Sequence, residues 1–339
     1  MNKLISFALI GSLSIGAMAQ DSETSYKMRV LLNDGSSEFY KTSDVKQVDF
    51  VEDEGQEQKI TAFLAGTDET KDGPLRTVTD QNVAGGGNLL TYPQTLSTDP
   101  LKKHPVVIWG PGGGTEPGAY MGMLNRLASQ GFVVFALQES LGGGDRMIAA
   151  INWLEQQNND PNSKFYNKLL LDRVGALGHS MGGLESEQAV IKDKRVVTAF
   201  LNNSGDRAHE AMSKVPQEKT FCILYGEGGM ERPNAYADYN NPGVKVPACL
   251  IKMSGGQGNE CASDYDGAPR ECGWGHGSGS WSGMACTVAW MRWHIGGESF
   301  RRADFIGPNA KYMNGPIVGE MGYWRGVNKN WDNFVDFEF

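Results

Sequence analysis

Continuous apolar runs recur along the chain from about residue 75, and amphipathic stretches separate them. Strands that are buried on both faces have no polar alternation, and helices between them cover the two faces of a mostly parallel sheet. The pattern therefore predicts an α/β protein with a doubly wound, mostly parallel sheet. The expected strands cover residues 106–109, 132–137, 173–177, 196–201, 220–225 and 248–253, and the expected helices cover 121–129, 147–157, 184–191 and 286–294.

The N-terminus has the features of a secretory signal peptide. Lys3 precedes an apolar run over residues 4–17, and the small-x-small exit Ala17-Met18-Ala19 is followed at once by polar Gln20. The run is shorter than the ~20 residues that a membrane-spanning helix needs. We therefore expect residues 1–19 to be removed and the mature protein to be secreted or periplasmic, with no membrane span.

The next forty residues differ from the rest of the chain. Strand-like residues 26–32 and 37–40 flank the hairpin signal Asn33-Asp34-Gly35, residues 45–51 could add a strand, and 52–58 form an acidic, Gln-rich stretch. This pattern predicts a small β module with an acidic linker over residues 20–60. The main domain is then expected over residues 61–310, with a C-terminal extension over 311–339.

Charge and cysteine content narrow the function. The 31 basic and 40 acidic residues give a formal net charge of −9, which argues against nucleic-acid binding because that usually requires a basic face. Cys261 and Cys272 flank a polar loop and are the predicted disulfide pair, whereas Cys222 and Cys286 lie in apolar segments and are expected to be buried. The spacing of cysteines and histidines does not suggest a metal site.

The segment Gly178-His179-Ser180-Met181-Gly182-Gly183 fits the pattern G-x-S-x-G. It follows the expected strand at 173–177 and precedes an expected helix, which is the context of a nucleophile elbow. The serine hydroxyl of such a turn is exposed above the sheet, and the glycines remove side chains that would collide there. A chance Gly-Ser-Gly turn would not have this strand and helix on either side. We expect Ser180 to be a catalytic nucleophile.

A second glycine-rich segment, residues 110–114, directly follows the expected strand 106–109. A serine hydrolase needs two backbone N–H donors for its oxyanion, one from the residue after the nucleophile and one from a loop after an earlier strand. Met181 and Gly113 are the expected donors. The alternative is a phosphate-binding loop, but the segment lacks both the Lys-Ser/Thr ending and the G-x-G-x-x-G spacing.

His276 is the expected general base. It lies in a loop after the last expected parallel strand, where the chain order serine, acid, histidine places the base. His179 adjoins the nucleophile, and Trp274 lies two residues before the base. We expect both to contact substrate.

Three carboxylates are candidates for the acid that orients the base. Asp206 follows the expected strand 196–201, and Glu227 and Glu231 follow the expected strand 220–225. A carboxylate beyond either strand end could reach the imidazole. Asp206 is the preferred candidate, Glu231 and Glu227 are alternatives, and a serine–histidine pair without a strong acid remains open.

Several blocks of the chain, taken in order, resemble the bacterial polyester hydrolase and cutinase family, within the α/β-hydrolases related to dienelactone hydrolases. The blocks are residues 85–93, 111–113 with 127–134, 172–183 and 287–293, and the resemblance spans about residues 75–305. It implies an α/β-hydrolase fold and an ester substrate. Two positions depart from the family: its catalytic aspartate falls on Gly229, and its aromatic oxyanion residue falls on Gly113.

These observations predict a secreted serine carboxylic-ester hydrolase that works through an acyl-enzyme, without cofactor or metal. Candidate substrates are plant-polymer esters and polyesters, and the protein is expected to be a monomer. One alternative is a serine peptidase or amidase, because the same triad cleaves amides. Another is a catalytically impaired hydrolase that binds polymer through the N-terminal β module.

Overall fold

The structure is a computed structural model that describes residues 27–31, 37–44, 68–99, 102–255, 260–261 and 272–336. The chain divides into two compact units, Met1–Glu57 and Gln58–Phe339. In the first, β1 (Lys27–Leu31) pairs antiparallel with β2 (Ser37–Lys41), and the short helix η1 (Thr42–Asp44) follows. The predicted signal peptide, hairpin turn, third strand and acidic linker lie outside the described residues.

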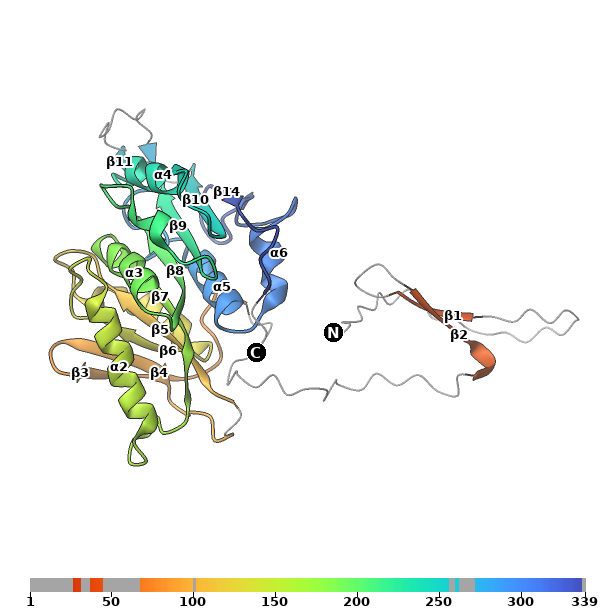
Figure 1. Ribbon diagram of the computed structural model, residues 1–339, viewed down its shortest axis with the longest axis horizontal. Coiled ribbons are helices and arrows are strands. Elements are labelled where there is room, and N and C mark those ends of the chain that lie inside the picture. The colour runs from red at the N-terminus through yellow and green to blue at the C-terminus, as the bar shows by residue number, and fades with distance from the viewer. Residues whose placement is uncertain are drawn as a thin grey trace, which may run out of the picture. The chain divides into compact units, whose positions relative to one another are not determined.

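The second unit is built around a ten-stranded sheet (Figure 1). Its six central strands, in the order β6, β5, β7, β8, β9 and β10, run parallel, and antiparallel pairs extend both ends. One end is formed by β4 and β3, and the other by β14 and β13. The strands are β3 (Thr77–Val83), β4 (Asn88–Pro93), β5 (His104–Gly110), β6 (Val133–Ala136), β7 (Leu169–His179), β8 (Val196–Asn202), β9 (Thr220–Gly226), β10 (Ala248–Ser254), β13 (Asn314–Pro316) and β14 (Tyr323–Lys329).

Helices cover both faces of this sheet, so the predicted doubly wound architecture is confirmed. Alternate residues of β5 enter two separate cores: Val107 and Trp109 pack on the side of α1 and α5, and Val106 and Ile108 pack on the side of α2, α3 and α4. The helices and 3₁₀ turns are η2 (Pro117–Tyr120), α1 (Met121–Ser129), α2 (Asp145–Asn159), α3 (Met181–Lys192), η3 (Ala211–Lys214), α4 (Arg232–Asn240), α5 (Met284–His294), η5 (Ser299–Arg301) and α6 (Arg302–Phe305).

The C-terminal segment is part of the main sheet, which corrects the predicted boundary at residue 310. All seven residues of β14 pair with β10, and Trp324 is buried in the core. The other side chains of β14 are partly or fully exposed, so the strand lacks the continuous apolar run by which the central strands were predicted.

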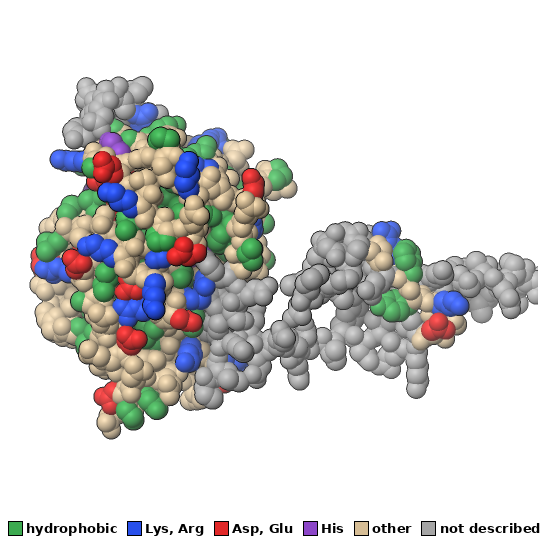
Figure 2. All heavy atoms as spheres, viewed as in Figure 1, with side chains coloured by type: hydrophobic (Ala, Val, Ile, Leu, Met, Phe, Trp, Pro, Cys, Tyr) green, Lys and Arg blue, Asp and Glu red, His purple; other side chains and the backbone are tan. Residues whose placement is uncertain are grey.

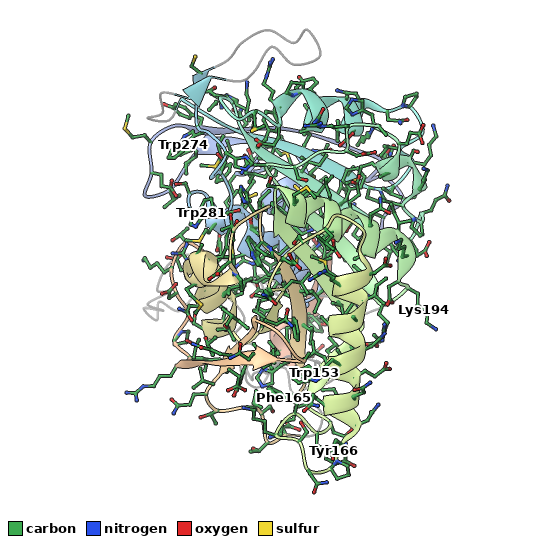
Figure 3. The ribbon with its side chains drawn as sticks, turned by 90° about the vertical axis from the view of Figure 1, so that its left-hand side faces the viewer. Trp153, Phe165, Tyr166, Lys194, Trp274 and Trp281 are labelled. Carbon is green, nitrogen blue, oxygen red and sulfur yellow. The ribbon has the colours of Figure 1, made fainter. Side chains whose placement is uncertain are left out.

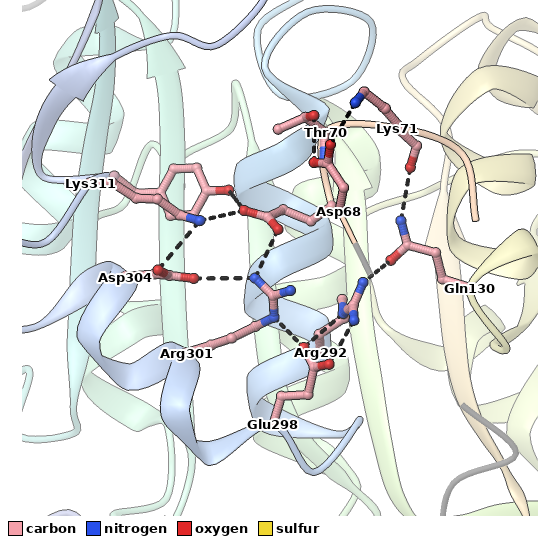
Figure 4. Close-up of polar contacts among 11 residues, drawn as sticks. Asp68, Thr70, Lys71, Gln130, Arg292, Glu298, Arg301, Asp304 and Lys311 are labelled. Atoms are coloured by element: carbon pink, nitrogen blue, oxygen red, sulfur yellow. Dashed lines mark hydrogen bonds and ion pairs between the residues drawn. The ribbon is translucent and has the colours of Figure 1, made fainter. Parts of the chain in front are cut away.

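A cluster of ionised side chains joins distant segments of the chain (Figure 4). We call Glu69, Arg292, Glu298, Arg301, Asp304 and Lys311 the charged cluster. Arg292 Nη2 lies 2.6 Å from Glu298 Oε1, Arg301 Nη1 lies 3.1 Å from Glu69 Oε2, and Lys311 also contacts Glu69. Burial raises the pKa of Glu69, but Lys311 and Arg301 outweigh it and lower the value to about 2. The charged cluster therefore joins the segment of Glu69, which precedes β3, to three later parts of the chain. These are α5, α6 and the segment before β13.

The described cysteines lie in two different environments. Cys222, Cys249 and Cys286 are buried free thiols, so the expectation for Cys222 and Cys286 is confirmed. The backbones of Cys261 and Cys272 face each other where β11 (Glu260–Cys261) pairs with β12 (Cys272–Gly273), and their disulfide stays a prediction.

On the face of the main unit seen in Figure 2, basic and acidic side chains are interspersed. Among the described residues, no helix has the length and apolarity needed to cross a bilayer.

Candidate active site

Ser180 lies between the end of β7 and the first residue of α3, as a nucleophile elbow requires. Its φ of 54° and ψ of −116° are unusual for a residue with a side chain, and such conformations store strain that clusters at functional sites. The Ser180 N–H donates to the carbonyl of Asn202 at 2.9 Å, which attaches the turn to the end of β8. The strained turn is therefore held to β8 by this hydrogen bond, and Ser180 stays partly exposed.

The glycines of the elbow are required by close backbone approach. A Cβ on Gly182 would overlap the carbonyl of Gly110, and a Cβ on Gly183 would overlap the side chain of Ser204. The start of α3 thus packs directly against the end of β5 on one side and against the segment after β8 on the other. This packing brings the loop after β5 beside the turn that carries Ser180.

The two expected oxyanion donors lie next to each other. A Cβ on Gly113 would stand 3.1 Å from Met181 Cγ, so the loop after β5 passes directly over the residue that follows Ser180. The loop turns tightly there, with the Thr115 N–H donating to the carbonyl of Gly112 at 3.0 Å and Gly114 at a φ of 72°. The structure therefore brings together the two segments that the sequence assigned to the oxyanion.

The carboxylate against His276 belongs to Glu231. His276 Nδ1 contacts Glu231 Oε1, with the carboxylate largely buried and the imidazole 37% exposed. Glu231 is the last residue before α4, in the loop after β9. A buried acid on Nδ1 and a solvent-accessible ring are the arrangement that the acid–base half of a catalytic triad requires.

Asp206, the preferred acid, is a wrong prediction. Its carboxylate accepts the backbone N–H groups of Ala208 at 3.2 Å and Glu210 at 3.3 Å, and so closes the turn after β8. Glu227, the other alternative, accepts the Gly255 N–H at 2.6 Å. Both carboxylates thus have backbone partners of their own, whereas Glu231 faces the imidazole.

Asn203, which the sequence did not single out, joins the acid and histidine loops. Its side-chain oxygen accepts the Gly226 N–H at 3.1 Å, and its amide nitrogen donates to the carbonyl of Ser278. It is buried and has a φ of 48°, a conformation that asparagine tolerates better than most residues. An asparagine at the end of a parallel strand was the only sequence signal for this role.

His179 is not placed to contact substrate as expected. It is only 2% exposed, and its ring lies between Tyr120 and the segment of His276. Its Nε2 lies 2.6 Å from the carbonyl oxygen of His276 and its Nδ1 lies 2.8 Å from the Tyr120 hydroxyl. Burial, and then the nearby charge of His276, lower the pKa of His179 to about 4, so the ring is neutral at pH 7.

Two tryptophans line this side of the domain (Figure 3). The Trp274 indole donates to the carbonyl of Met321 at 3.2 Å. Trp281 is 45% exposed, stacks on Tyr120 with ring centroids 4.9 Å apart, and donates to the carbonyl of Ala119 at 2.8 Å. The loop 317–322 between β13 and β14 supports the same segment, because Glu320 accepts the Gly283 N–H at 2.8 Å.

Residues 60–216, somewhat less than half of the chain, match the PET hydrolase-like family. The matched segment contains the sheet from β3 to β8, the loop with Gly113 and the elbow with Ser180, while Glu231 and His276 lie beyond it. No curated protein matches the chain. Together with the sheet order and the helices on both faces, the match shows that the chain has an α/β-hydrolase fold and resembles PET hydrolases.

Proposed function

We propose that the protein is a serine carboxylic-ester hydrolase that works through an acyl-enzyme. The observation that carries the proposal is the contact between Glu231 and His276. The backbone carbonyl of His276 also accepts a hydrogen bond from His179, the residue just before Ser180. Ser180, Glu231 and His276 all lie in segments that follow parallel strands (β7, β9 and β10), and α/β sheets place their sites beyond the carboxyl ends of such strands.

In the proposed reaction, Ser180 Oγ attacks the ester carbonyl and His276 Nε2 accepts its proton. Glu231 stabilises the imidazolium that forms. The N–H groups of Gly113 and Met181 bind the oxyanion, and each such donor typically contributes about 3 kcal/mol to the transition state. His276 then protonates the leaving alcohol, and water attacks the acyl-enzyme to release the acid.

The surroundings of the site support a substrate with an extended apolar part. Trp281 approaches His179 with ring centroids 5.0 Å apart. It also lines a neighbouring cavity of about 690 Å³, whose walls are partly apolar (Met284, Ile317, Val318, Trp324) and partly charged (Asp68, Glu69, Arg126, Lys311, Glu320) and do not include Ser180 or His276. Met321 and Val318 expose more than half of their surface in the same loop. Cutin-type or polyester chains would bury these side chains, and the resemblance to PET hydrolases points to the same class.

The test of the chemistry is the Ser180→Ala variant, assayed with a short p-nitrophenyl ester and labelled with a fluorophosphonate. We expect loss of hydrolysis by more than about 10⁴-fold and no adduct. Ser213→Ala is the matched control, since its hydroxyl only donates to the carbonyl of Glu210. Retained activity in Ser180→Ala would overturn the mechanism. A wild-type protein that is neither labelled nor active would favour the polymer-binding alternative, and faster cleavage of the matching anilide would favour an amidase.

Export belongs to the proposal as well. Residues 1–19 have the pattern of a signal peptide, so the secreted or periplasmic protein should begin at Gln20. It should be a monomer with a Cys261–Cys272 disulfide. N-terminal sequencing, light scattering and mass spectrometry of the non-reduced peptide would each contradict one part if they gave another start, another mass or free thiols at these positions.

A further inference from the structure

A continuous chain of hydrogen bonds crosses the floor of the proposed site. The Gly112 N–H donates to Tyr120 Oη at 3.0 Å, Tyr120 Oη lies 2.8 Å from His179 Nδ1, and His179 Nε2 lies 2.6 Å from the carbonyl oxygen of His276. We call these contacts the Tyr120–His179 chain. It begins beside Gly113, passes the residue before Ser180 and ends on the backbone of His276.

One arrangement of protons satisfies every member of the chain. The carbonyl of His276 can only accept, so His179 carries its proton on Nε2 and donates it there. His179 Nδ1 then accepts from the Tyr120 hydroxyl, whose oxygen accepts from Gly112. Burial raises the pKa of the Tyr120 hydroxyl and lowers that of His179, so both groups stay neutral over the pH range of an esterase assay.

The side chains of the Tyr120–His179 chain are also held by packing. Tyr120 is completely buried, with the rings of Trp109 and Trp281 each centred 4.9 Å from its own. A Cβ on Gly112 would lie 2.7 Å from His179 Nδ1, so a side chain at this position would displace the imidazole. The contacts therefore set the distance between the loop of Gly113 and the loop of His276.

We propose that Tyr120 and His179 are positioning residues, which hold the backbone of His276 and the oxyanion loop in one geometry around Ser180. The inference rests on the proposed function. A displacement of about 1 Å of a catalytic group can cost on the order of 10²-fold in rate. Because neither side chain is exposed enough to bind substrate, their loss should lower kcat and leave KM nearly unchanged.

Two amide substitutions at His179 separate positioning from space filling. His179→Gln places its amide nitrogen near the former Nε2, so it can still donate to the carbonyl of His276. His179→Asn places its amide near the former Nδ1, so it keeps the contact with Tyr120 and loses the one with His276. We expect His179→Asn to lower kcat by about 10- to 100-fold and His179→Gln by less than about fivefold, with KM within twofold in both.

Tyr120→Phe supplies a second, milder test, because it removes only the hydroxyl and retains the ring between the two tryptophans. We expect about a tenfold lower kcat, and a Tyr120→Phe/His179→Asn double variant that loses no more than His179→Asn alone, since both changes interrupt one chain. The rate at which a fluorophosphonate labels Ser180 should fall in parallel with kcat.

The failure of this inference is distinguishable from failure of the proposed function. If Ser180→Ala is inactive but His179→Asn or Tyr120→Phe leaves kcat unchanged, or acts through KM, only the positioning role is overturned. Equal losses in His179→Asn and His179→Gln would overturn it too. Should His179→Asn not fold, as judged by circular dichroism, the kcat and labelling rate of Tyr120→Phe decide the matter.

Discussion

The charged cluster and the Tyr120–His179 chain are both networks of buried polar groups, but they are built on opposite principles. Every side chain of the charged cluster is ionisable, and the buried pair of Arg292 and Glu298 is matched charge for charge. The Tyr120–His179 chain contains a phenol, a neutral imidazole and two backbone groups, and carries no charge. One network lies at the junction of distant segments, and the other lies beneath the proposed site.

The difference follows from what each region must tolerate. A buried charge is stable only when it is paired, so the charged cluster holds its segments firmly as long as all members are present. A site in which negative charge develops on the substrate is better supported by neutral dipoles of fixed orientation, because they add no competing charge. The comparison predicts that damage to the charged cluster affects folding, and that damage around Ser180 affects rate.

The largest effect is expected from the one carboxylate that faces the imidazole. Glu231→Gln keeps the shape of the side chain but cannot stabilise the imidazolium, so kcat for an ester should fall about 10⁴-fold without loss of folded protein. Asp206→Asn is the matched control and should keep kcat within about threefold, because its one side-chain oxygen can still accept one of the two backbone N–H groups and the residue does not face His276. Equal losses of kcat in the two variants would contradict the assignment of Glu231 as the acid.

The second largest effect is a loss of stability when a substitution breaks the charged cluster. Glu298→Gln leaves Arg292 and Arg301 without their shared carboxylate, and the free energy of unfolding in urea should fall by about 3–5 kcal/mol. The kcat of the protein that remains folded should not change. Lys71→Ala removes an exposed ion pair with Asp68 at the edge of the same region and should cost less than about 1 kcal/mol. A stable Glu298→Gln variant with reduced kcat would reverse the comparison.

The third effect is a pH dependence of stability from His179. Its folded pKa of about 4 lies below its ordinary value of 6.5, so the neutral ring contributes stability that is complete above pH 6.5 and is lost as the pH falls toward 4. This loss is on the order of 3 kcal/mol. The contribution of His179 is measured by urea unfolding of the wild type and of His179→Gln at pH 7 and pH 4. The other groups titrate alike in the two proteins, so a change with pH in the difference between their free energies of unfolding comes from His179. A constant difference between the two proteins would show that His179 is not held neutral.

The sequence predicted those parts of the molecule that depend on neighbouring residues. The elbow with Ser180 and the central strands were predicted correctly because the motif and the apolar runs are local patterns. The choice between Asp206 and Glu231 could not be made in this way. Each follows a parallel strand, and only the path of the loops, tied by Asn203 to the backbone near Ser278, decides which carboxylate reaches His276.

The charged cluster and β14 were missed for similar physical reasons. Members of the charged cluster lie as far apart in the sequence as Glu69 and Lys311. A single arginine or glutamate in a sequence predicts an exposed residue, because these side chains are rarely buried unless they are paired. In β14 only Trp324 is buried, so its pattern is that of a half-exposed strand and not of a central one. Both features depend on tertiary contacts that the local pattern does not contain.

The hairpin of β13 and β14 has a consequence for the order in which the protein becomes active. Its loop supports the segment of Trp274 and Gly283, which flanks His276, yet it is synthesised after every other element of the domain except the residues beyond Lys329. A nascent chain can form the elbow around Ser180 long before this support exists. Esterase activity is therefore expected to appear only when these last strands join the sheet, later than the folding of the elbow itself.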